Sequence, residues 1–171
     1  MALRYPKNYN RQMVIRKDNV ADSGWMLIAS GISSRGSNFT ENSETYTYWS
    51  GRGTSEVVPT SQEISYSYSG NRAIGDIAQD YLFDDILYDL DSRDVEFMDF
   101  DDGIDVSGEN PPPNGWKGKG TISITDPGSG DANARQTIGF SINLKGKPEK
   151  GTVKKEGETY TWIPYAPSVG V

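Results

Sequence analysis

The sequence contains no cysteine and no histidine. Without cysteine there can be no disulfide framework, no thiolate zinc site and no cysteine nucleophile. Without histidine the chain lacks the commonest general base and the commonest ligand of transition metals. Acidic residues outnumber basic residues by 24 to 17, which gives a net charge of −7. A net acidic chain is also poorly suited to gripping nucleic acid phosphates.

Long apolar runs are missing as well. No segment approaches the roughly 18 apolar residues that a membrane-spanning helix needs, and residues 1–7 lack the apolar stretch of a secretory signal. We therefore expect a soluble protein that folds where it is made and has no membrane partner. Its 171 residues fit a single domain, 1–171, whose hydrophobic core is large enough to be stable without covalent cross-links.

Charge is distributed unevenly along the chain. Residues 1–75 carry a net charge of +2, residues 76–109 carry −12, and residues 110–171 carry +3. One interpretation is a solvated acidic face. The other is a self-complementary molecule whose acidic patch meets a basic patch on a neighbouring copy, an arrangement that builds rings or filaments. The charge pattern alone leaves both open.

Short apolar runs and strict alternation of apolar and polar residues predict a mainly β fold. In the segment from Gln62 to Tyr68, for example, Ile64, Tyr66 and Tyr68 fall on one face. Glycine, proline and aspartate separate the predicted strands, and the first two read as a hairpin. The predicted strands are 11–16, 25–29, 62–68, 95–100, 121–125, 137–145 and, more weakly, 152–163.

One helix is predicted between Asn71, a plausible N-cap, and Leu90. It has two apolar stripes, whereas the surface helix of a monomer normally buries one. The second stripe either packs under a loop of its own chain or meets another subunit. The first stripe is Ile74, Ile77, Ala78, Tyr81 and Leu82, and the second is Phe83, Leu87 and Leu90.

The same helix places Asp76, Asp80 and Asp84 one turn apart. Each such pair of like charges should cost about 0.2–0.5 kcal/mol in an isolated helix. Only Asp76, near the N-terminus, gains from the helix dipole. The column therefore suggests a functional rather than a stabilising role.

Two segments fit neither a strand nor a helix. Residues 30–55 are rich in serine, glycine, asparagine and threonine, yet they contain Phe39, Tyr46, Tyr48 and Trp49. Loops of this length are usually functional or disordered, and a disordered linker would not contain four aromatic residues. The second segment, residues 108–118, contains three consecutive prolines and predicts a stiff extended loop.

The sequence offers no convincing catalytic or metal site. The aspartates between Asp99 and Asp105 could hold Ca²⁺, but their spacing does not fit the EF-hand template. Acidic pairs for glycoside hydrolysis are so abundant that they carry no information. The glycines at 115–120 are not a phosphate loop, and no G-x-S-x-G nucleophile motif occurs. We expect no enzyme and no cofactor.

The outward faces of the alternating strands are unusual, because they carry short neutral hydroxyl and amide side chains where charged ones are common. Two explanations of this composition stay open. Either serine and threonine occur there simply because strands tolerate them, or the face is a smooth, wetted wall along which something slides. The residues are Ser65, Ser67, Thr121, Ser123, Thr125, Ser141 and Asn143, with Glu63 and Lys145 at the ends.

In the order of these features, residues 10–163 resemble a phage tail tube protein, the major tail protein of long-tailed phages. The same fold is shared by the inner tubes of contractile tails and by type VI secretion tubes. The resemblance rests on no single diagnostic motif. Its parts are the N-terminal hairpin, the aromatic loop 30–55, the strand and helix 62–90 with Gly75–Tyr81, the acidic middle with Val95–Phe100, and the closing strands 118–125 and 137–146.

The resemblance implies a single-domain β-sandwich or barrel with one flanking α-helix and a long extended loop. It implies hexameric rings that stack into a hollow tube, whose neutral or negative channel lets DNA pass during ejection. The hydroxyl-rich face, with Glu63, would line the channel. Loop 30–55 and the second helix stripe would contact neighbouring subunits, and residues 1–10 and 164–171 would form an N-terminal arm and a C-terminal tail.

The resemblance further implies a location in the virion tail, with assembly in the host cytoplasm. The partners would be other copies of the chain, the tape measure, tail terminator and distal tail proteins, and transiently passing DNA. Lys145 departs from the pattern, since a cation on the channel face would attract phosphate. The alternative function is a free-standing β-sandwich module that binds carbohydrate through Tyr46, Tyr48 and Trp49.

Overall fold

A computed structural model describes residues 7–18, 20, 24–108 and 111–165. Its elements are η1 (Asn8–Asn10), β1 (Arg11–Lys17), β2 (Met26–Ile28), β3 (Ile32–Thr47), η2 (Trp49–Gly51), β4 (Ser55–Asn71), α1 (Ile77–Asp80), the π-helical turn η3 (Tyr81–Asp85), β5 (Asp94–Asp101), β6 (Gly115–Ser129), β7 (Thr137–Glu156) and β8 (Thr159–Pro164). Most of the predicted N-terminal arm, residues 1–6, and of the C-terminal tail, residues 166–171, lies outside the described residues.

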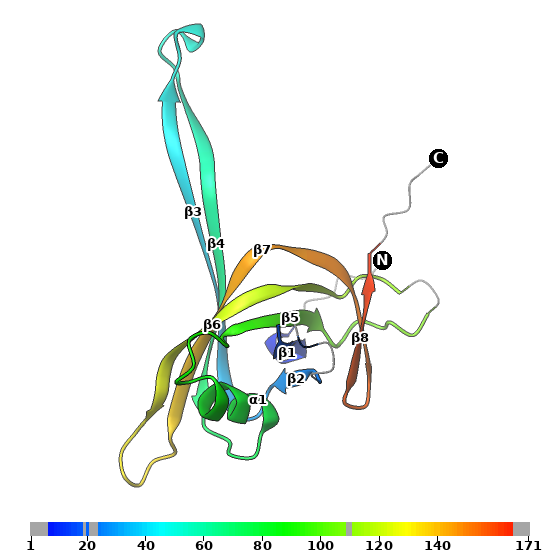
Figure 1. Ribbon diagram of the computed structural model, residues 1–171. Coiled ribbons are helices and arrows are strands. Elements are labelled where there is room, and N and C mark those ends of the chain that lie inside the picture. The colour runs from blue at the N-terminus through cyan, green and yellow to red at the C-terminus, as the bar shows by residue number, and fades with distance from the viewer. Residues whose placement is uncertain (1–6, 19, 21–23, 109–110, 166–171) are drawn as a thin grey trace.

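The strands form one antiparallel sheet in the order β2-β1-β5-β6-β7-β4-β3, and β8 pairs with the second half of β7. The mainly β fold is thus confirmed, including the N-terminal hairpin of β1 with β2 and the pairing of β6 with β7. Over the described residues the sheet does not close into a barrel. Figure 1 shows the sheet curving around a body from which β3 and β4 project as a long ribbon.

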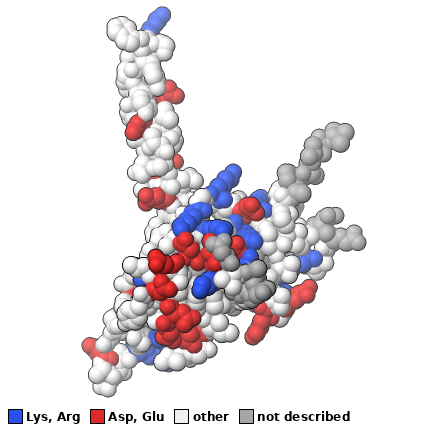
Figure 2. Space-filling view, viewed as in Figure 1, with Lys and Arg blue, Asp and Glu red and all other residues white. Residues whose placement is uncertain are grey.

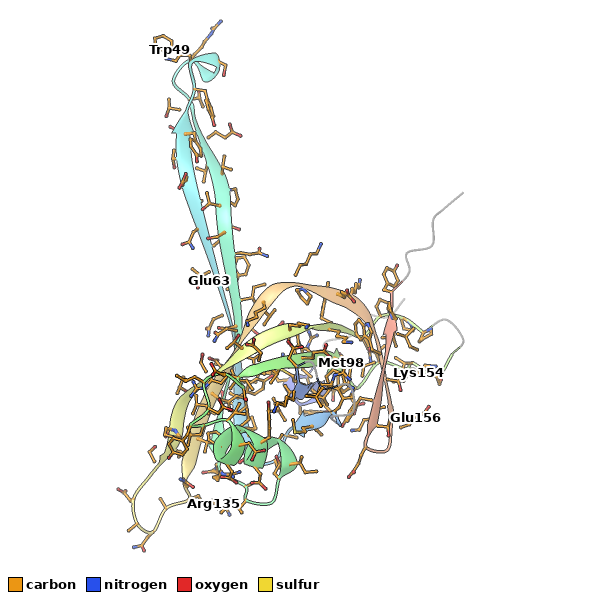
Figure 3. All side chains as sticks on the ribbon, in the orientation of Figure 1. Trp49, Glu63, Met98, Arg135, Lys154 and Glu156 are labelled. Atoms are coloured by element: carbon orange, nitrogen blue, oxygen red, sulfur yellow. The ribbon has the colours of Figure 1, made fainter. Side chains whose placement is uncertain are left out.

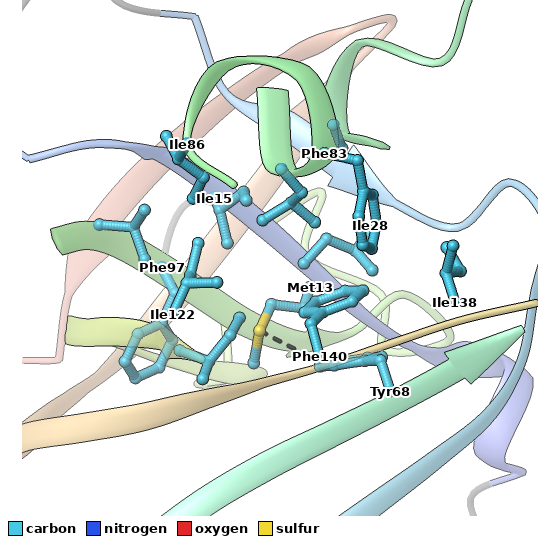
Figure 4. Close-up of a cluster of buried hydrophobic side chains, with 14 residues drawn as sticks. Met13, Ile15, Ile28, Tyr68, Phe83, Ile86, Phe97, Ile122, Ile138 and Phe140 are labelled. Atoms are coloured by element: carbon cyan, nitrogen blue, oxygen red, sulfur yellow. Dashed lines mark hydrogen bonds between the residues drawn. The ribbon is translucent and has the colours of Figure 1, made fainter. Parts of the chain in front are cut away.

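Two clusters of apolar side chains cover opposite faces of the sheet. The larger cluster lies between the sheet and the α1–η3 segment and includes Met13, Phe97 and Phe140 (Figure 4). The smaller cluster joins Met98 and Phe100 to Val153 and Tyr160 from β7 and β8. Neighbouring residues of β5 therefore enter different clusters, so apolar side chains of this strand are buried on both faces of the sheet. At about 0.8 kcal/mol per buried CH₂ group, these two clusters supply the main stabilisation.

The final strand differs from the prediction of one element over residues 152–163. β7 continues to Glu156, the chain turns at Gly157, and β8 returns along it from Thr159. Gly157 has a φ of 62°, a left-handed conformation that glycine adopts without steric cost. The turn lets β8 cover the second face of the sheet with Tyr160.

The helix is shorter than predicted, and it begins at Asp76 rather than Asn71. Asp76 is the N-cap, since its carboxylate accepts a hydrogen bond from the backbone N–H of Gln79 at 3.0 Å. Asn71 is instead the last residue of β4. The buried amide of Gln79 explains the late start: it donates to the carbonyl of Ser30 and accepts from the N–H of Ala73 at 2.7 Å.

The column of aspartates is explained by structure rather than by function. The guanidinium of Arg72 lies 2.8 Å from Asp80 and 3.0 Å from Asp84. One cation on the neighbouring strand end therefore offsets the repulsion between the two carboxylates, while Asp76 serves as the cap. The expectation that stability cannot account for the column is wrong.

The predicted stripes of the helix are also corrected. Ile74 and Ile77, expected in the core, are exposed, whereas Phe83 is buried in the larger cluster against Phe140. Phe83 therefore cannot present a surface to another subunit. Leu87 is half-buried and Leu90 is exposed. The helix has one buried side, which places Ala78, Leu82 and Phe83 in the larger cluster.

The segment expected to be an irregular loop, residues 30–55, is mostly strand. β3 pairs with β4 from Ile32–Gly70 out to Thr47–Ser55, although β4 pairs with β7 only between Ser65 and Asn71. Residues 39–64 thus project beyond the rest of the sheet, and we call them the arm. The loop prediction failed because both faces of the arm are in solvent, so no alternation of apolar residues marks the strands.

A buried ion pair holds the base of the arm to the body. Asp99 on β5 is fully buried and lies 2.7 Å from Arg11 and 2.8 Å from Arg35. Arg35 belongs to β3, and its guanidinium lies over the rings of Tyr66 and Tyr68 at 5.0 and 5.7 Å. The direction of the arm is therefore coupled to the centre of the sheet.

Candidate functional surfaces

The hydroxyl-rich residues singled out from the sequence lie side by side on three neighbouring strands. Strand register places Asn143 of β7 between Ser65 of β4 and Thr121 of β6. The next row places Ser141 between Ser67 and Ser123. These six residues form what we call the polar face, on the side of the sheet opposite the helix.

Side chains of the polar face bond to one another and to the backbone beneath them. The side-chain amide of Asn143 donates to the hydroxyl of Ser123 at 2.8 Å. Thr125 lies at the margin, beside the irregular pairing that follows Ile124. Glu63 lies further along β4, where the arm leaves the body (Figure 3). The face offers short hydrogen-bonding groups and little apolar surface, so water covers it readily.

Three cations on the same side of the sheet as the polar face are paired with carboxylates. Lys145 lies 2.7 Å from Asp94, Lys119 lies 2.8 Å from Asp18, and Arg16 lies next to Glu96 at 2.5 Å. The pKa of Asp94 is lowered by the hydrogen bond from Lys145 and then by that from Thr121, so the carboxylate stays ionised. The departure noted for Lys145 is therefore offset locally by Asp94.

The arm carries the aromatic residues of the predicted loop, and they face solvent. Phe39 and Tyr48 are largely exposed, and Trp49, at the tip, is 101% exposed (Figure 3). The rings of Tyr46 and Tyr48 stack with their centroids 6.0 Å apart. Exposed tryptophan and tyrosine side chains are typical of residues that become buried in an interface.

A second group of exposed apolar residues lies around the helix. Ile74, Ile77, Tyr88 and Leu90 are each more than 70% exposed. Of these, sequence reasoning assigned only Leu90 to a surface. Acidic residues surround this group, and Figure 2 shows them gathered over the α1 region.

The remaining candidate sites are structural. The carboxylate of Asp101 accepts a hydrogen bond from the N–H of Gly103, and Asp105 accepts one from Ser107, so both stabilise turns. Among the described residues, no group of three or more acidic side chains could hold a metal ion. No helix in the described part of the chain is long and apolar enough to cross a membrane.

Comparison with known proteins adds information only at the level of structure. No protein-family model and no curated protein sequence match the chain. Solved structures do match, and they include a phage tail tube and the tail of a phage-like particle. The SPP1 tail tube gives a TM-score of 0.59 with 17% identity, covering 85% of this chain and 78% of that chain.

Two further matches belong to other kinds of particle. The tail of an empty gene transfer agent particle, with C6 symmetry, gives a TM-score of 0.53 at 17% identity and covers 84% of this chain and 97% of that one. The sheath–tube complex of an extracellular contractile injection system gives 0.54 at 12% identity, with coverages of 87% and 93%. The chain has a tail tube fold. The resemblance drawn from the sequence is thereby confirmed.

Proposed function

We propose that this chain is a structural subunit of a virion tail tube, in which six copies form a ring and the rings stack around a channel for DNA. The observation that carries the proposal is the tail tube fold over more than four fifths of the chain, shared with a tail of C6 symmetry. The polar face and the exposed aromatic arm support it. The tape measure, tail terminator and distal tail proteins are the partners that such a tube requires.

Electron microscopy of the concentrated, purified protein tests the assembly directly. We expect negatively stained rings or tubes. Dispersed small particles at all concentrations would contradict the proposal and favour the alternative, a carbohydrate-binding module that uses the exposed Tyr46, Tyr48 and Trp49. Glycan binding that is lost in Trp49→Ala would support that alternative.

We further propose that the polar face lines the channel. Duplex DNA carries about one charge per 1.7 Å of its axis, and each contact with lysine or arginine adds salt-dependent affinity. Ser65, Ser67, Ser123 and their neighbours supply no cation, and Lys145 at the border is paired with Asp94. DNA would therefore pass over water and hydroxyl groups without being held.

Ser123→Lys tests this assignment, because it adds one unpaired cation per subunit to the polar face. The subunit should fold and tubes should form, since Ser123 is not part of either apolar cluster. DNA ejection should slow, and the delay should grow at low ionic strength. Asn133→Lys, on the exposed β6–β7 turn, is the matched control. Ejection at the normal rate from Ser123→Lys tubes would show that this face does not line the channel.

A further inference from the structure

The tip of the arm, residues 48–53, combines an exposed aromatic side chain with a positive charge. Trp49 is fully exposed, although such a side chain buries about 150–250 Å² in a core or an interface. Arg52 is the one basic residue between residues 36 and 71, whereas the same stretch holds four glutamates. Figure 2 shows this isolated positive charge at the end of the arm. A surface that receives the tip should therefore be apolar in its centre and acidic at its border.

A groove with these properties lies at the free edge of the sheet, between β2 and the α1–η3 segment. We call it the edge groove, and its volume is about 460 Å³. Its apolar floor is formed by Met26, Ile77 and Tyr81, and its acidic border by Asp85 and Asp89. Ile77 is largely exposed, so nothing within the described chain covers that part of the floor.

The border of the edge groove is negative. Residues 84–91 contain four aspartates and no basic residue. The pKa of Asp89 is lowered by hydrogen bonds from the Ser92 side chain and then from the Asp91 N–H, so Asp89 stays ionised. Lys17 also lines the groove, and it reduces this negative charge without cancelling it.

Another hollow, beside the base of the arm, is less suitable. It is lined by the basic residues Lys7, Arg11 and Arg35 against the acidic residues Asp99 and Asp101. Its net positive charge would repel Arg52. The edge groove of the same chain is not available to the tip either, because the arm projects away from the body on the side opposite α1 (Figure 1). An occupant with the chemistry of the tip must come from a second copy.

We propose that the edge groove of one copy receives the arm tip of another copy, with Trp49 on the apolar floor and Arg52 facing Asp85 and Asp89. This inference rests on the proposed tube assembly and specifies the surface on which the arm docks. The contact is head-to-tail, because tip and groove are different surfaces of the same chain, so it propagates from copy to copy.

The absence of cysteine from the chain allows a clean crosslinking test. Ser50→Cys places a thiol beside Trp49 in the tip. Gly24→Cys places one at the edge groove, where a built Cβ meets no atom within 4 Å. The two variants, distinguished by a size tag on one of them, are mixed, allowed to assemble and oxidised. We expect a mixed disulfide-linked dimer. The control is a mixture of Ser50→Cys with Thr125→Cys, whose thiol is exposed on the polar side. This mixture should give little disulfide-linked dimer.

A charge exchange provides the second readout. Arg52 and Asp89 are both exposed, so reversing either charge should leave folding intact. Arg52→Glu alone and Asp89→Lys alone should each lower the crosslink yield several-fold. Combining Arg52→Glu on the tip-bearing copy with Asp89→Lys on the groove-bearing copy should restore it, because the pair of opposite charges is re-formed in reverse.

Electron microscopy of the same samples separates the two hypotheses. Tubes together with the mixed crosslink and its restoration support the docking. Tubes that form without the Ser50–Gly24 crosslink, or with equal crosslinking at Thr125, overturn the docking and leave the tube proposal intact. If the unmodified protein forms no assembly at any concentration, the tube proposal is wrong and the docking falls with it.

Discussion

Replacing Asp99 with asparagine should destabilise the subunit more than any change of a single exposed acid. Asp99 is fully buried on β5 and accepts both ion pairs at the base of the arm, from Arg11 at 2.7 Å and from Arg35 at 2.8 Å. Asparagine has the same shape but no charge. The variant therefore leaves two guanidinium groups facing one neutral amide.

The size of the loss follows from the burial of the three partners. Removing one partner of a buried ion pair costs about 3–5 kcal/mol, because the other charge stays buried without compensation. Arg35 is only 17% exposed and cannot escape to water, whereas Arg11 is 38% exposed and can. We therefore expect a loss near the lower limit, about 3 kcal/mol. That is a large share of the roughly 5–15 kcal/mol by which a domain is stable.

The free energy of unfolding can be measured on dilute subunits by urea denaturation, using the fluorescence of the four tryptophans. Asp102→Asn is the matched control, because Asp102 is exposed and receives only a 3.3 Å hydrogen bond from Gln12. Its effect should stay within about 0.5 kcal/mol. Hydrogen exchange should also quicken at the base of the arm in Asp99→Asn. A loss below about 1 kcal/mol would refute the reasoning, since it would mean that the buried charges gain almost nothing from each other.

Three further changes test other parts of the structure. Gly70→Ala should lower the melting temperature by the equivalent of about 1–3 kcal/mol, because a Cβ there would lie 2.1 Å from the carbonyl oxygen of Gly31; an unchanged melting temperature would argue against the β3–β4 register. Asp94→Asn should be less stable than the native chain at pH 7. Because the hydrogen bond from Lys145 lowers the folded-state pKa of Asp94, this deficit should fade as the pH falls below about 4, and urea titrations showing a constant deficit would contradict the pairing. Arg72→Met should selectively loosen the α1 segment, seen as faster hydrogen exchange there, since two aspartates lose their shared cation.

Strands with one buried face could be predicted well from the sequence. In residues 62–68 the alternation identified the strand, and Tyr66 and Tyr68 pack in the larger cluster on its inward face, because burial on one side selects apolar residues at every second position. Ile64 shares the alternation but lies in the arm, beyond the pairing of β4 with β7. The same logic placed Ser65 and Ser67 together on the outward face. That Asn143 lies between them and β6 required the register, which no local pattern encodes.

The arm and the helix could not be predicted in the same way. The part of β3 from Phe39 to Thr47 has water on both faces. Its strand conformation depends on backbone hydrogen bonds to β4, so the sequence shows no alternation of apolar residues there. The helix start at Asp76 depends on the buried amide of Gln79, which bonds to Ser30 and Ala73. Such pairings are tertiary, and they override the local helical spacing of apolar residues.

The pairing of charges was equally hidden. Lys145 and Asp94 are 51 residues apart in the chain, and only the sheet order β5-β6-β7 brings their side chains together. In the sequence, Lys145 stood out on the polar face, because a cation there would attract the phosphates of DNA. In the structure its charge is offset by the carboxylate of Asp94. The net charge of a surface therefore depends on residues that are close in space but distant in the sequence.

In the proposed assembly, the length of the arm sets how far from its target a subunit can make first contact. The nine residues from Phe39 to Thr47, at about 3.3 Å each, span about 30 Å, roughly the diameter of a small domain. A subunit that makes first contact through its tip is held within that distance of its target before the two bodies have aligned. The tether raises the local concentration of the rest of the surface into the millimolar range. If the tip docks as proposed, slow rotational alignment would compete with release of a single small contact, and the rate of growth would depend on the lifetime of that contact rather than on the frequency of collisions.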